Sequence, residues 1–265
     1  MPNTYFAADL ALPAPNPLYL RYQQMQADTQ YSSHKHPWGQ LSWISLGVMD
    51  LELEQQHLIA PANYLTWVPA GIPHSAYVRQ ALNYTSIYVS AHLAQLLPKK
   101  ACLLTSTPLI SALICDFSQR QLSHMQDKSD QNQAELLITR LSQCKCAPNF
   151  LPTSSDTLIA PILKALQAEP DNARSLSSWA SEVHSTERTL ARRFQSELGM
   201  SFGQCRNRIR VLQALAWLKE DKTIQDIAWR LGYSTPSAFI AMFKQLIGLS
   251  PERYRQQMQE GRSYF

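Results

Sequence analysis

Two stretches in the last third of the chain repeat one pattern: a short helix, a tight turn and a second amphipathic helix. The first runs from Leu176 to about Gly199 and the second from Thr223 to about Gly248. In each, Ser or Thr stands where a helix would begin and Gly stands where the second helix would end, as expected for helix caps. The pattern predicts two helix–turn–helix units, and such a unit presents one helix to the major groove of DNA.

Residues inside and between the two units support this prediction. Gly232 allows the tight turn of the second unit, because glycine adopts positive φ angles without strain. Pro236 stands in the first turn of the next helix, where a missing N–H costs little. A longer helix, predicted from Ser201 to Lys219, joins the units. Its expected apolar face consists of Phe202, Ile209, Leu212, Leu215 and Ala216.

Charge is distributed unevenly along the 265 residues. Residues 1–170 hold 10 Lys/Arg and 11 Asp/Glu, a net charge of −1, whereas residues 171–265 hold 14 Lys/Arg and 9 Asp/Glu, a net charge of +5. A basic C-terminal part suits a protein that binds a polyanion such as DNA, although a difference of a few charges also arises by chance. The helix–turn–helix units therefore carry the DNA prediction, and the charge agrees with it.

The remaining composition is ordinary for a globular protein, with 45% hydrophobic and 17% charged residues. The first residues, MPNTYFAADLALPAPNP, lack the basic start and the apolar run of a signal peptide. No window offers the roughly 18 apolar residues that a membrane span needs. Five cysteines without an export signal are typical of reduced thiols. We therefore expect a cytoplasmic protein without a membrane partner.

The N-terminal half has a different pattern. Between Leu18 and about Ser90, the short runs LYLRYQQM, QLSWISLGVMDLEL, NYLTWVPA and YTSIYVSA alternate or cluster apolar residues, with Pro and Gly between them. This pattern is typical of a small antiparallel barrel or sandwich. From about Pro108 to Gln143, apolar residues recur at intervals of three and four, which predicts two amphipathic helices.

These segments predict an α+β protein with two domains. Residues 1–146 are expected to form a β-barrel with flanking helices, and residues 157–265 an all-α domain. The Pro- and Ser-rich stretch 147–156 is the predicted linker. Cys144 and Cys146 form a Cys-x-Cys pair beside it, which favours inert thiols at a helix end over a metal or redox site.

Two long stretches of the C-terminal part match a known signature in spacing and residue type. They are IAWRLGYSTPSAFIAMFK followed by GLSPERYR, and RTLARRFQSELGMSFGQCRNRIRVLQALAWL upstream of it. Through these stretches, residues from about 157 to 258 resemble the DNA-binding domain of the AraC/XylS transcriptional regulators. The resemblance implies a regulator in which two recognition helices contact successive major grooves of promoter DNA.

The resemblance also implies which side chains contact DNA. Arg188 and Arg192 would reach base edges, because arginine binds guanine O6 and N7 bidentately. In the second helix the family places base contacts at Ser237 and Ala241, but alanine offers only an apolar contact. The alternative for the arginines is a solvated helix face. The complete predicted set is Arg188, Thr189, Arg192, Arg193, Thr235, Ser237, Ala241 and Lys244, of which Arg193 and Lys244 suit phosphates best.

Histidines in the N-terminal part form a second pattern. The stretch HKHPWGQ contains His34, His36 and Gln40, and PAGIPH ends at His74. The spacing is similar to that of the two cupin motifs, which supply His-x-His, then Glu, then a third His. The chain departs from those motifs at Gln40, which stands in the Glu position, and at Asn63, which replaces a Gly.

The resemblance to cupins implies a ligand site inside a barrel. We expect His34 and His36 on one face of a strand and His74 on the neighbouring strand. Three imidazoles suit zinc, nickel, copper or iron(II), whereas the neutral Gln40 is a weaker fourth ligand than Glu. The alternatives are an organic effector and a purely structural role. Four aromatic residues could line a pocket, although aromatic residues of a small barrel more often belong to its core. They are Trp38, Trp43, Trp67 and Tyr77.

Together these features predict a DNA-binding transcriptional regulator whose N-terminal domain senses a metal ion or a small-molecule effector. The helices between about 108 and 143 are expected to pair two protomers, and RNA polymerase is a partner if the protein activates transcription. A cupin dioxygenase or isomerase fused to a DNA-binding domain is disfavoured, because no general acid or base accompanies the histidines by spacing. A third possibility is a barrel that only dimerises.

Overall fold

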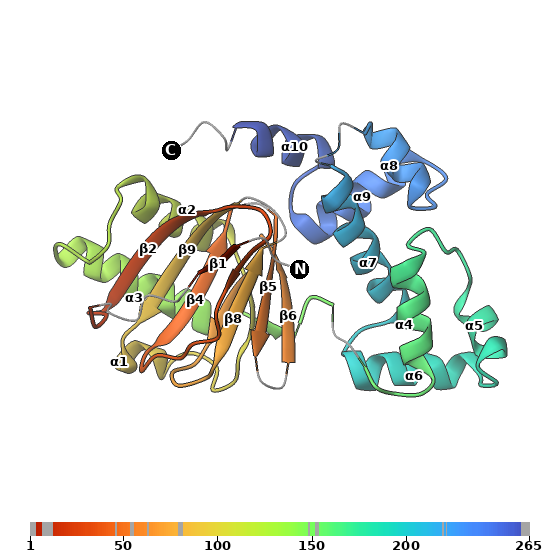
Figure 1. The fold of residues 1–265 in the computed structure, drawn as a ribbon, viewed down its shortest axis with the longest axis horizontal. Helices are drawn as coiled ribbons and strands as arrows, with labels where there is room; N and C mark the ends of the chain where they lie inside the picture. Colours follow the sequence, from red (N-terminus) through yellow and green to blue (C-terminus); the bar gives the residue numbers. More distant parts are fainter. Residues whose placement is uncertain are drawn as a thin grey trace. The chain divides into compact units, whose positions relative to one another are not determined.

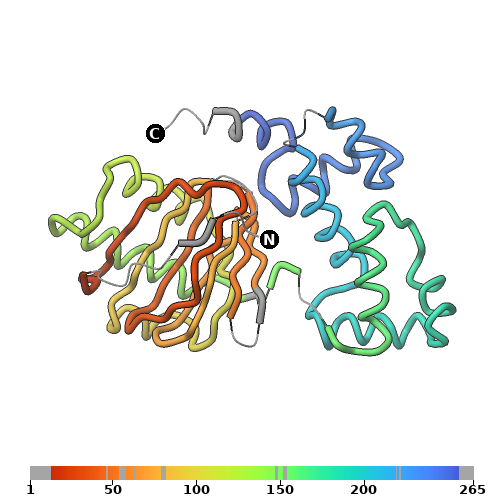
Figure 2. The backbone as a smooth tube through the Cα atoms, viewed as in Figure 1, coloured from red at the N-terminus to blue at the C-terminus, as the bar shows by residue number. Residues whose placement is uncertain are grey.

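A computed structural model divides the chain into two compact units, residues 1–150 and 151–265. It describes residues 4–6, 13–45, 47–53, 56–62, 64–78, 82–147, 149–151, 154–218, 220 and 222–260, and Figure 2 traces the backbone. The boundary between the units falls within the segment 147–156 that the sequence predicts as a linker. Asn63, where the sequence departs from the cupin pattern, lies outside the described residues.

Two β-sheets build the first unit (Figure 1). One has the strand order β1-β3-β8-β5-β6 and the other has the order β11-β10-β7-β4-β9-β2. The pairing of β1 with β3 is parallel, and the other described pairings are antiparallel. The strands are β1 (Thr4–Phe6), β2 (Leu18–Met25), β3 (Thr29–Tyr31), β4 (Gly39–Ile44), β5 (Val48–Leu53), β6 (Gln56–Pro61), β7 (Tyr64–Val68), β8 (His74–Val78), β9 (Leu82–Val89), β10 (Cys102–Thr105) and β11 (Cys146–Ala147).

Strand β4 separates the core from the candidate site, because successive side chains of a strand point to opposite faces. Leu41 and Trp43 belong to the large core cluster that contains residues of α2 and α3. Ile44 belongs to a second cluster, which contains residues of both sheets. Gln40 and Ser42 share the face of Ile44, so this face of β4 brings polar groups between the sheets.

Helices cover one face of the six-stranded sheet (Figure 1). They are α2 (Pro108–Gln119) and α3 (Lys128–Ser142), and the short α1 (Ala91–Ala94) precedes them. Thr107 and Asp127 cap their first turns. The two amphipathic helices predicted between about 108 and 143 are therefore present. The sequence patterns did not predict β1, β10 and β11, because these strands are short.

The second unit is helical in all its described elements, so the predicted α+β class is confirmed. Side chains of Ser or Thr begin most of its helices, and Gly199 and Gly248 end α6 and α9 in the left-handed conformation. The helices are α4 (Ile159–Ala168), α5 (Leu176–Glu182), α6 (Glu187–Leu198), α7 (Phe202–Trp217), α8 (Ile224–Arg230), α9 (Pro236–Ile247) and α10 (Pro251–Glu260). Among the described residues, none of the helices combines the length and the apolarity needed to cross a bilayer.

The buried face of the joining helix α7 differs from the prediction. Ala216 is exposed and Leu212 is only half-buried, whereas Val211 and Ala214 are fully buried. The reason is that α7 packs against both α4 and α9. A helix that packs against two neighbours buries a wider and rotated face than a single apolar stripe.

Candidate functional site

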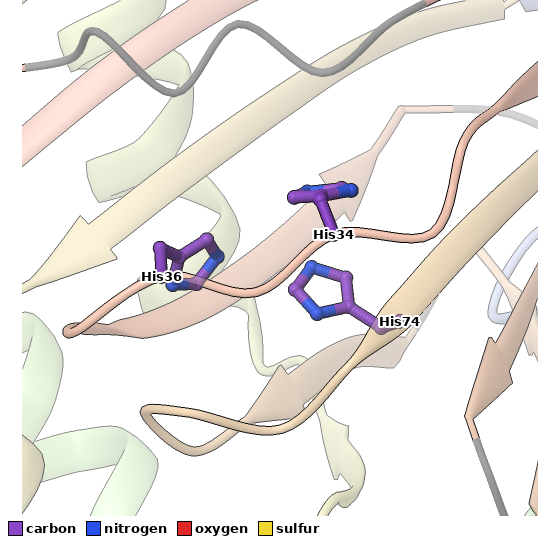
Figure 3. Close-up of side chains that lie close together, drawn as sticks. All are labelled: His34, His36 and His74. Carbon is purple, nitrogen blue, oxygen red and sulfur yellow. The ribbon is translucent and has the colours of Figure 1, made fainter.

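The three histidines come together in the first unit (Figure 3). His74 begins β8, and His34 and His36 lie in the irregular segment between β3 and β4. The His34 N–H donates to the His74 carbonyl over 3.0 Å, and the His74 N–H donates to the His34 carbonyl over 2.9 Å. The Gly71 N–H donates to the His36 carbonyl over 2.9 Å. Backbone hydrogen bonds thus fix the segment that carries the cluster.

One sequence-based expectation for this cluster is wrong. His34 makes only an isolated β-bridge with His74, and neither His34 nor His36 lies in a strand. Pro37 follows directly and has no N–H to donate, so a regular strand cannot continue through it. His74 does come from a strand, and the bridge makes it the neighbour of His34 as expected.

The imidazole rings are close enough to share one ligand. Their candidate ligand atoms all lie within 4.8 Å of one another. The ring centroids of His34 and His74 are 4.4 Å apart, and those of His36 and His74 are 5.1 Å apart. His36 and His74 are buried, and His34 is half-buried. One side of the cluster therefore remains accessible through His34.

Each histidine uses its Nδ1 in the same way. The Nδ1 atoms of His34, His36 and His74 lie 2.9, 2.7 and 2.9 Å from backbone carbonyl oxygens of Ser32, Trp38 and Ile72 respectively. A carbonyl oxygen only accepts, so each Nδ1 carries the proton and donates it. In a neutral imidazole the lone pair is then on Nε2. The backbone thus selects one tautomer three times, and this tautomer leaves three Nε2 atoms as acceptors.

Gln40 lies between two of these acceptors. Its Oε1 is 2.7 Å from His36 Nε2 and 3.1 Å from His74 Nε2. Its Nε2 donates to Tyr84 OH over 2.9 Å and to Ser42 Oγ over 3.3 Å. Both hydroxyls can also donate, so the amide fits either way round: with its NH2 donating to the two Nε2 atoms, or with its oxygen facing them. A cation between the imidazoles would favour the second orientation, in which the amide oxygen and the imidazole lone pairs are all acceptors.

Burial favours the neutral form of His74 and His34. It lowers the pKa of His74 from 6.5 to about 4, against the opposing effect of the hydrogen bond to Ile72. Burial also lowers the pKa of His34, and the neighbouring His36 adds to that effect. The neutral imidazole is the form that coordinates a metal, so these histidines need not lose a proton to bind one.

The aromatic residues near the cluster divide into two groups. The ring of Trp38 stacks against His36 at 5.8 Å, and Tyr88 meets the same imidazole edge-on at 5.4 Å. Trp43 and Trp67 instead belong to the core cluster that contains residues of α2 and α3. Tyr77 donates its hydroxyl hydrogen to Asp28. Of the four predicted aromatics, Trp38 is therefore the one that contacts the histidines.

In the first helix–turn–helix, α6 carries the predicted DNA-contacting arginines. Arg188 and Arg192 are exposed, lie one turn apart on the same face, and make no hydrogen bond or ion pair with any described residue. Thr189 is half-buried and accepts a hydrogen bond from the side chain of Thr186. Arg193 forms an ion pair with Asp156 over 3.2 Å. Arg193 is thus engaged within the protein, whereas Arg188 and Arg192 are free.

In the second helix–turn–helix, α9 carries the other predicted residues. Ser237, Ala241 and Lys244 recur along one side of this helix and are exposed. The Thr235 side chain accepts from the Ala238 N–H and so caps the helix. α9 therefore exposes one cationic side chain, that of Lys244, whereas α6 exposes two arginines that have no partner among the described residues.

The sequence did not predict a set of contacts between the two helix–turn–helix units, which we call the joint. The buried Arg210 of α7 donates from Nε to the Pro170 carbonyl over 2.9 Å, and its guanidinium lies 4.9 Å above the ring of Tyr233. At Gly232, with φ of +75°, an added Cβ would come within 2.6 Å of the Asp171 carbonyl oxygen. Sequence patterning assigns arginine to the surface, so nothing in the periodicity signalled a buried one.

Comparisons with known proteins match both units. A family model described as a helix-turn-helix domain matches residues 179–257, and one described as an AraC-like ligand binding domain matches residues 16–142. The chain is 30% identical over 221 residues to the HTH-type transcriptional regulator NimR of Escherichia coli K12, which covers 83% of this chain and 81% of NimR.

Two further similarities cover different shares of the chain. The HTH-type transcriptional activator RhaR of Escherichia coli K12 is 29% identical over 105 residues, which are 39% of this chain and 37% of RhaR. A crystal structure of ToxT from Vibrio cholerae is 14% identical, with 91% of this chain and 97% of that chain covered at a TM-score of 0.39.

Proposed function

Because the chain belongs to the AraC family of transcriptional regulators, we propose that it binds specific promoter sequences and that its N-terminal domain binds a divalent transition metal as effector. The metal would lie between His34, His36 and His74. Relatives in this comparison are named as transcriptional regulators and not as enzymes. The names of these relatives give no support to an enzymatic role for the histidines.

One observation carries the metal proposal: each of the three Nδ1–H groups donates to a backbone carbonyl. A histidine that only stabilises a core can adopt either tautomer, whereas the backbone carbonyls favour the same one in all three histidines of the cluster. Metal-binding histidines typically donate their second ring nitrogen to a carbonyl or carboxylate in this way. The Nε2 atoms of His36 and His74 both lie beside Gln40 Oε1, and His34 offers a ring nitrogen within 4.8 Å of ring nitrogens of the other two histidines.

The residues present suit a borderline metal. Three imidazole nitrogens favour zinc, copper, nickel or iron(II) over magnesium or calcium, which prefer oxygen ligands. Gln40 Oε1 is the adjacent oxygen donor. The bound ion would supply positive charge that links the segment 32–38 to β8. Because those backbone contacts already exist, little rearrangement would accompany binding.

For DNA, the proposal assigns base reading mainly to α6. On α6, Arg188 and Arg192 are exposed and their guanidinium groups have no partner among the described residues, so they would contact base edges. Thr189 and Arg193 would support α6 at its edge, and Arg193 would have to leave Asp156 to reach a phosphate. In α9, Ser237 and Ala241 would approach bases, and Thr235 and Lys244 would lie near the sugar–phosphate backbone.

The proposal extends to the organisation of the regulator. Residues 1–146 would bind effector and pair two protomers through the helices of about 108–143, residues 147–156 would link the domains, and residues 157–265 would bind DNA. The protein would act in the cytoplasm as a homodimer and would contact RNA polymerase if it activates transcription.

Metal binding is tested on the purified full-length protein. Zinc, nickel, copper and iron(II) would each be added, and the metal retained after gel filtration measured for wild type, His34→Ala and His74→Ala. His92→Ala is the matched control, because His92 is an exposed histidine on α1. We expect one metal per chain in wild type and control, and a loss of on the order of 100-fold in affinity in the two cluster variants.

Other outcomes separate the alternatives. Equal retention in wild type and His34→Ala would refute the metal site. If no metal binds and His34→Ala still changes regulation in cells, an organic effector at the same histidines replaces the metal. If neither happens and the protein still binds promoter DNA, the N-terminal unit serves pairing alone.

A further inference from the structure

We propose that Cys102 and Cys146 form a thiol pair that closes to a reversible disulfide when the protein meets a peroxide. This inference goes beyond the proposed function, because it concerns neither the histidine cluster nor the DNA-binding helices. It assigns a modification site to the place where the chain leaves the N-terminal unit, four residues before the unit boundary at Phe150.

Strand pairing brings the two cysteines together. β10 and β11 are antiparallel, with Leu104 opposite Cys146 and Leu103 opposite Ala147. Cys102 lies two residues before Leu104 on β10, so it points to the same face of the sheet. Cys102 is therefore the diagonal neighbour of Cys146 on one face of the sheet. Diagonal neighbours are about 7–8 Å apart, at the upper limit for a disulfide, so closure requires the two-residue edge strand β11 to shift toward β10. Cys146 is also the neighbouring group that, after burial, raises the pKa of the Cys102 thiol.

The two thiols differ in accessibility. Cys146 is exposed, whereas Cys102 is buried with 2% of its surface accessible. This asymmetry suits a pair in which one sulfur meets the oxidant and the other resolves the product. Burial, and then the neighbouring Cys146, raises the pKa of Cys102. The second step is therefore expected to become faster as pH rises, because Cys102 must lose its proton to attack.

The chemistry balances with hydrogen peroxide as the oxidant. The Cys146 thiolate attacks one peroxide oxygen, the O–O bond breaks, and Cys146 becomes a sulfenic acid while hydroxide leaves. The Cys102 sulfur then attacks the sulfenic sulfur, an S–S bond forms, and a second hydroxide leaves. The two thiol protons neutralise the two hydroxides. Two thiols thus lose two electrons, and one peroxide becomes two waters.

The other cysteines are placed differently. Cys144 lies near the same core cluster, but its Sγ donates to the Arg140 carbonyl at the end of α3 over 3.3 Å. Cys115 is half-buried on α2. Cys205 is buried in α7 of the other unit. The pairing of β10 with β11 thus singles out Cys102, although Cys144 is only two residues away from Cys146 in sequence.

Closure would have a structural effect at a defined place. β11 has two residues and pairs with β10 alone in its sheet, at the edge. A covalent link to β10 would hold this strand in its pairing. The amide hydrogen bonds between β10 and β11 should then open less often, and their hydrogen exchange should slow by on the order of tenfold or more.

The experiment uses the full-length chain and tryptic peptides mapped without reduction. Trypsin cuts after Lys145 and so separates Cys144, in residues 141–145, from Cys146, in residues 146–164. Cys102 and Cys115 fall in one peptide, residues 101–120, so the test is made in a Cys115→Ser background. After treatment with hydrogen peroxide we expect peptides 101–120 and 146–164 to be linked, with an intact mass about 2 Da lower that dithiothreitol restores.

Matched variants decide the assignment. Cys144→Ser should keep the link, whereas Cys146→Ser and Cys102→Ala should abolish it, because each removes the cysteine of one linked peptide. A link between 141–145 and 146–164, or loss of the link in Cys144→Ser, would overturn the proposal. The proposal would also be overturned if Cys146 stayed fully reduced, or stopped at the sulfenic acid, in a protein that circular dichroism shows to be folded. Metal and DNA binding by the same sample report separately on the proposed function.

Discussion

Replacing Gly232 by Ala tests the joint between the two helix–turn–helix units. The backbone at Gly232 has φ of +75°, and the new Cβ would lie 2.6 Å from the Asp171 carbonyl oxygen. The oxygen belongs to the backbone of the turn after α4, so it cannot rotate away as a flexible side chain would. Relief requires that the turn or the start of the second unit shifts, which would also strain the hydrogen bonds of Arg210 to Pro170 and Asp171.

Gly199 provides the matched control. It has φ of +67°, and nothing lies within 4 Å of an added Cβ. Gly199→Ala therefore incurs only the cost of a left-handed alanine, about 1 kcal/mol. Gly232→Ala incurs the same cost and adds the clash, which in well-packed protein costs about 1–3 kcal/mol. We expect the free energy of unfolding to fall by about 2–4 kcal/mol in Gly232→Ala, two to four times the effect of Gly199→Ala.

The measurement is urea unfolding of the full-length protein, followed by circular dichroism at the helical band, to which the second unit contributes most of the helices. The m-value checks that both variants unfold from the same compact state. Equal losses in the two variants would refute the argument, because the difference between them isolates the contact with Asp171. A larger loss in Gly199→Ala would contradict it as well.

Three further predictions concern the candidate sites. Arg192→Ala should weaken binding to the cognate operator by about 1–3 kcal/mol and relax the preference at one base pair. Lys244→Ala should weaken binding to all sequences alike and reduce the slope of log affinity against log salt concentration by about 1. Both effects are measured by DNA-binding titrations at several salt concentrations. Gln40→Glu should tighten metal binding by on the order of tenfold and lower stability without metal, because it buries a charge. Gln40→Leu should weaken metal binding, and it should also lower stability because it removes a hydrogen-bond partner of buried polar groups. Equal affinity in Gln40→Glu and wild type would count against Gln40 as a donor. In metal-free protein, the lowered pKa of His74 means that the folded state holds fewer protons than the unfolded state between about pH 4 and 6.5. The free energy of unfolding should therefore fall by about 1–3 kcal/mol as pH drops through that window. His74→Gln should flatten this dependence when unfolding is measured over the same range of pH.

The helices of the second unit could be predicted closely because their signals are local. Thr186, Thr223 and Thr235 stand at the N-caps that the sequence indicates, and Gly199 ends α6 in the left-handed conformation. A cap acts on its own helix within one turn, so a single sequence contains it. The exposed face of α6 follows in the same way from the burial of Leu190 and Phe194.

What the sequence could not give depends on contacts between distant residues. The position of Gln40 in the motif predicted a weak ligand. Its contacts with Ser42 and Tyr84 could not be predicted, because they arise only when β4 and β9 pair. The histidine tautomers depend on carbonyls of irregular backbone, which no periodicity describes. Arg210 lies buried because two turns far apart in sequence meet around it.

The order of strands in the six-stranded sheet has a consequence for how the protein is made. The sheet runs β11-β10-β7-β4-β9-β2, so its two edges come from residues 146–147 and 18–25. The sheet is not complete until residue 147 has left the ribosome, because the edge strand β11 pairs with β10. Its long-range pairing is slow because loop closure precedes the stabilising contacts. The capped helices of the second unit need only local contacts. The part synthesised last is therefore expected to fold faster than the part synthesised first.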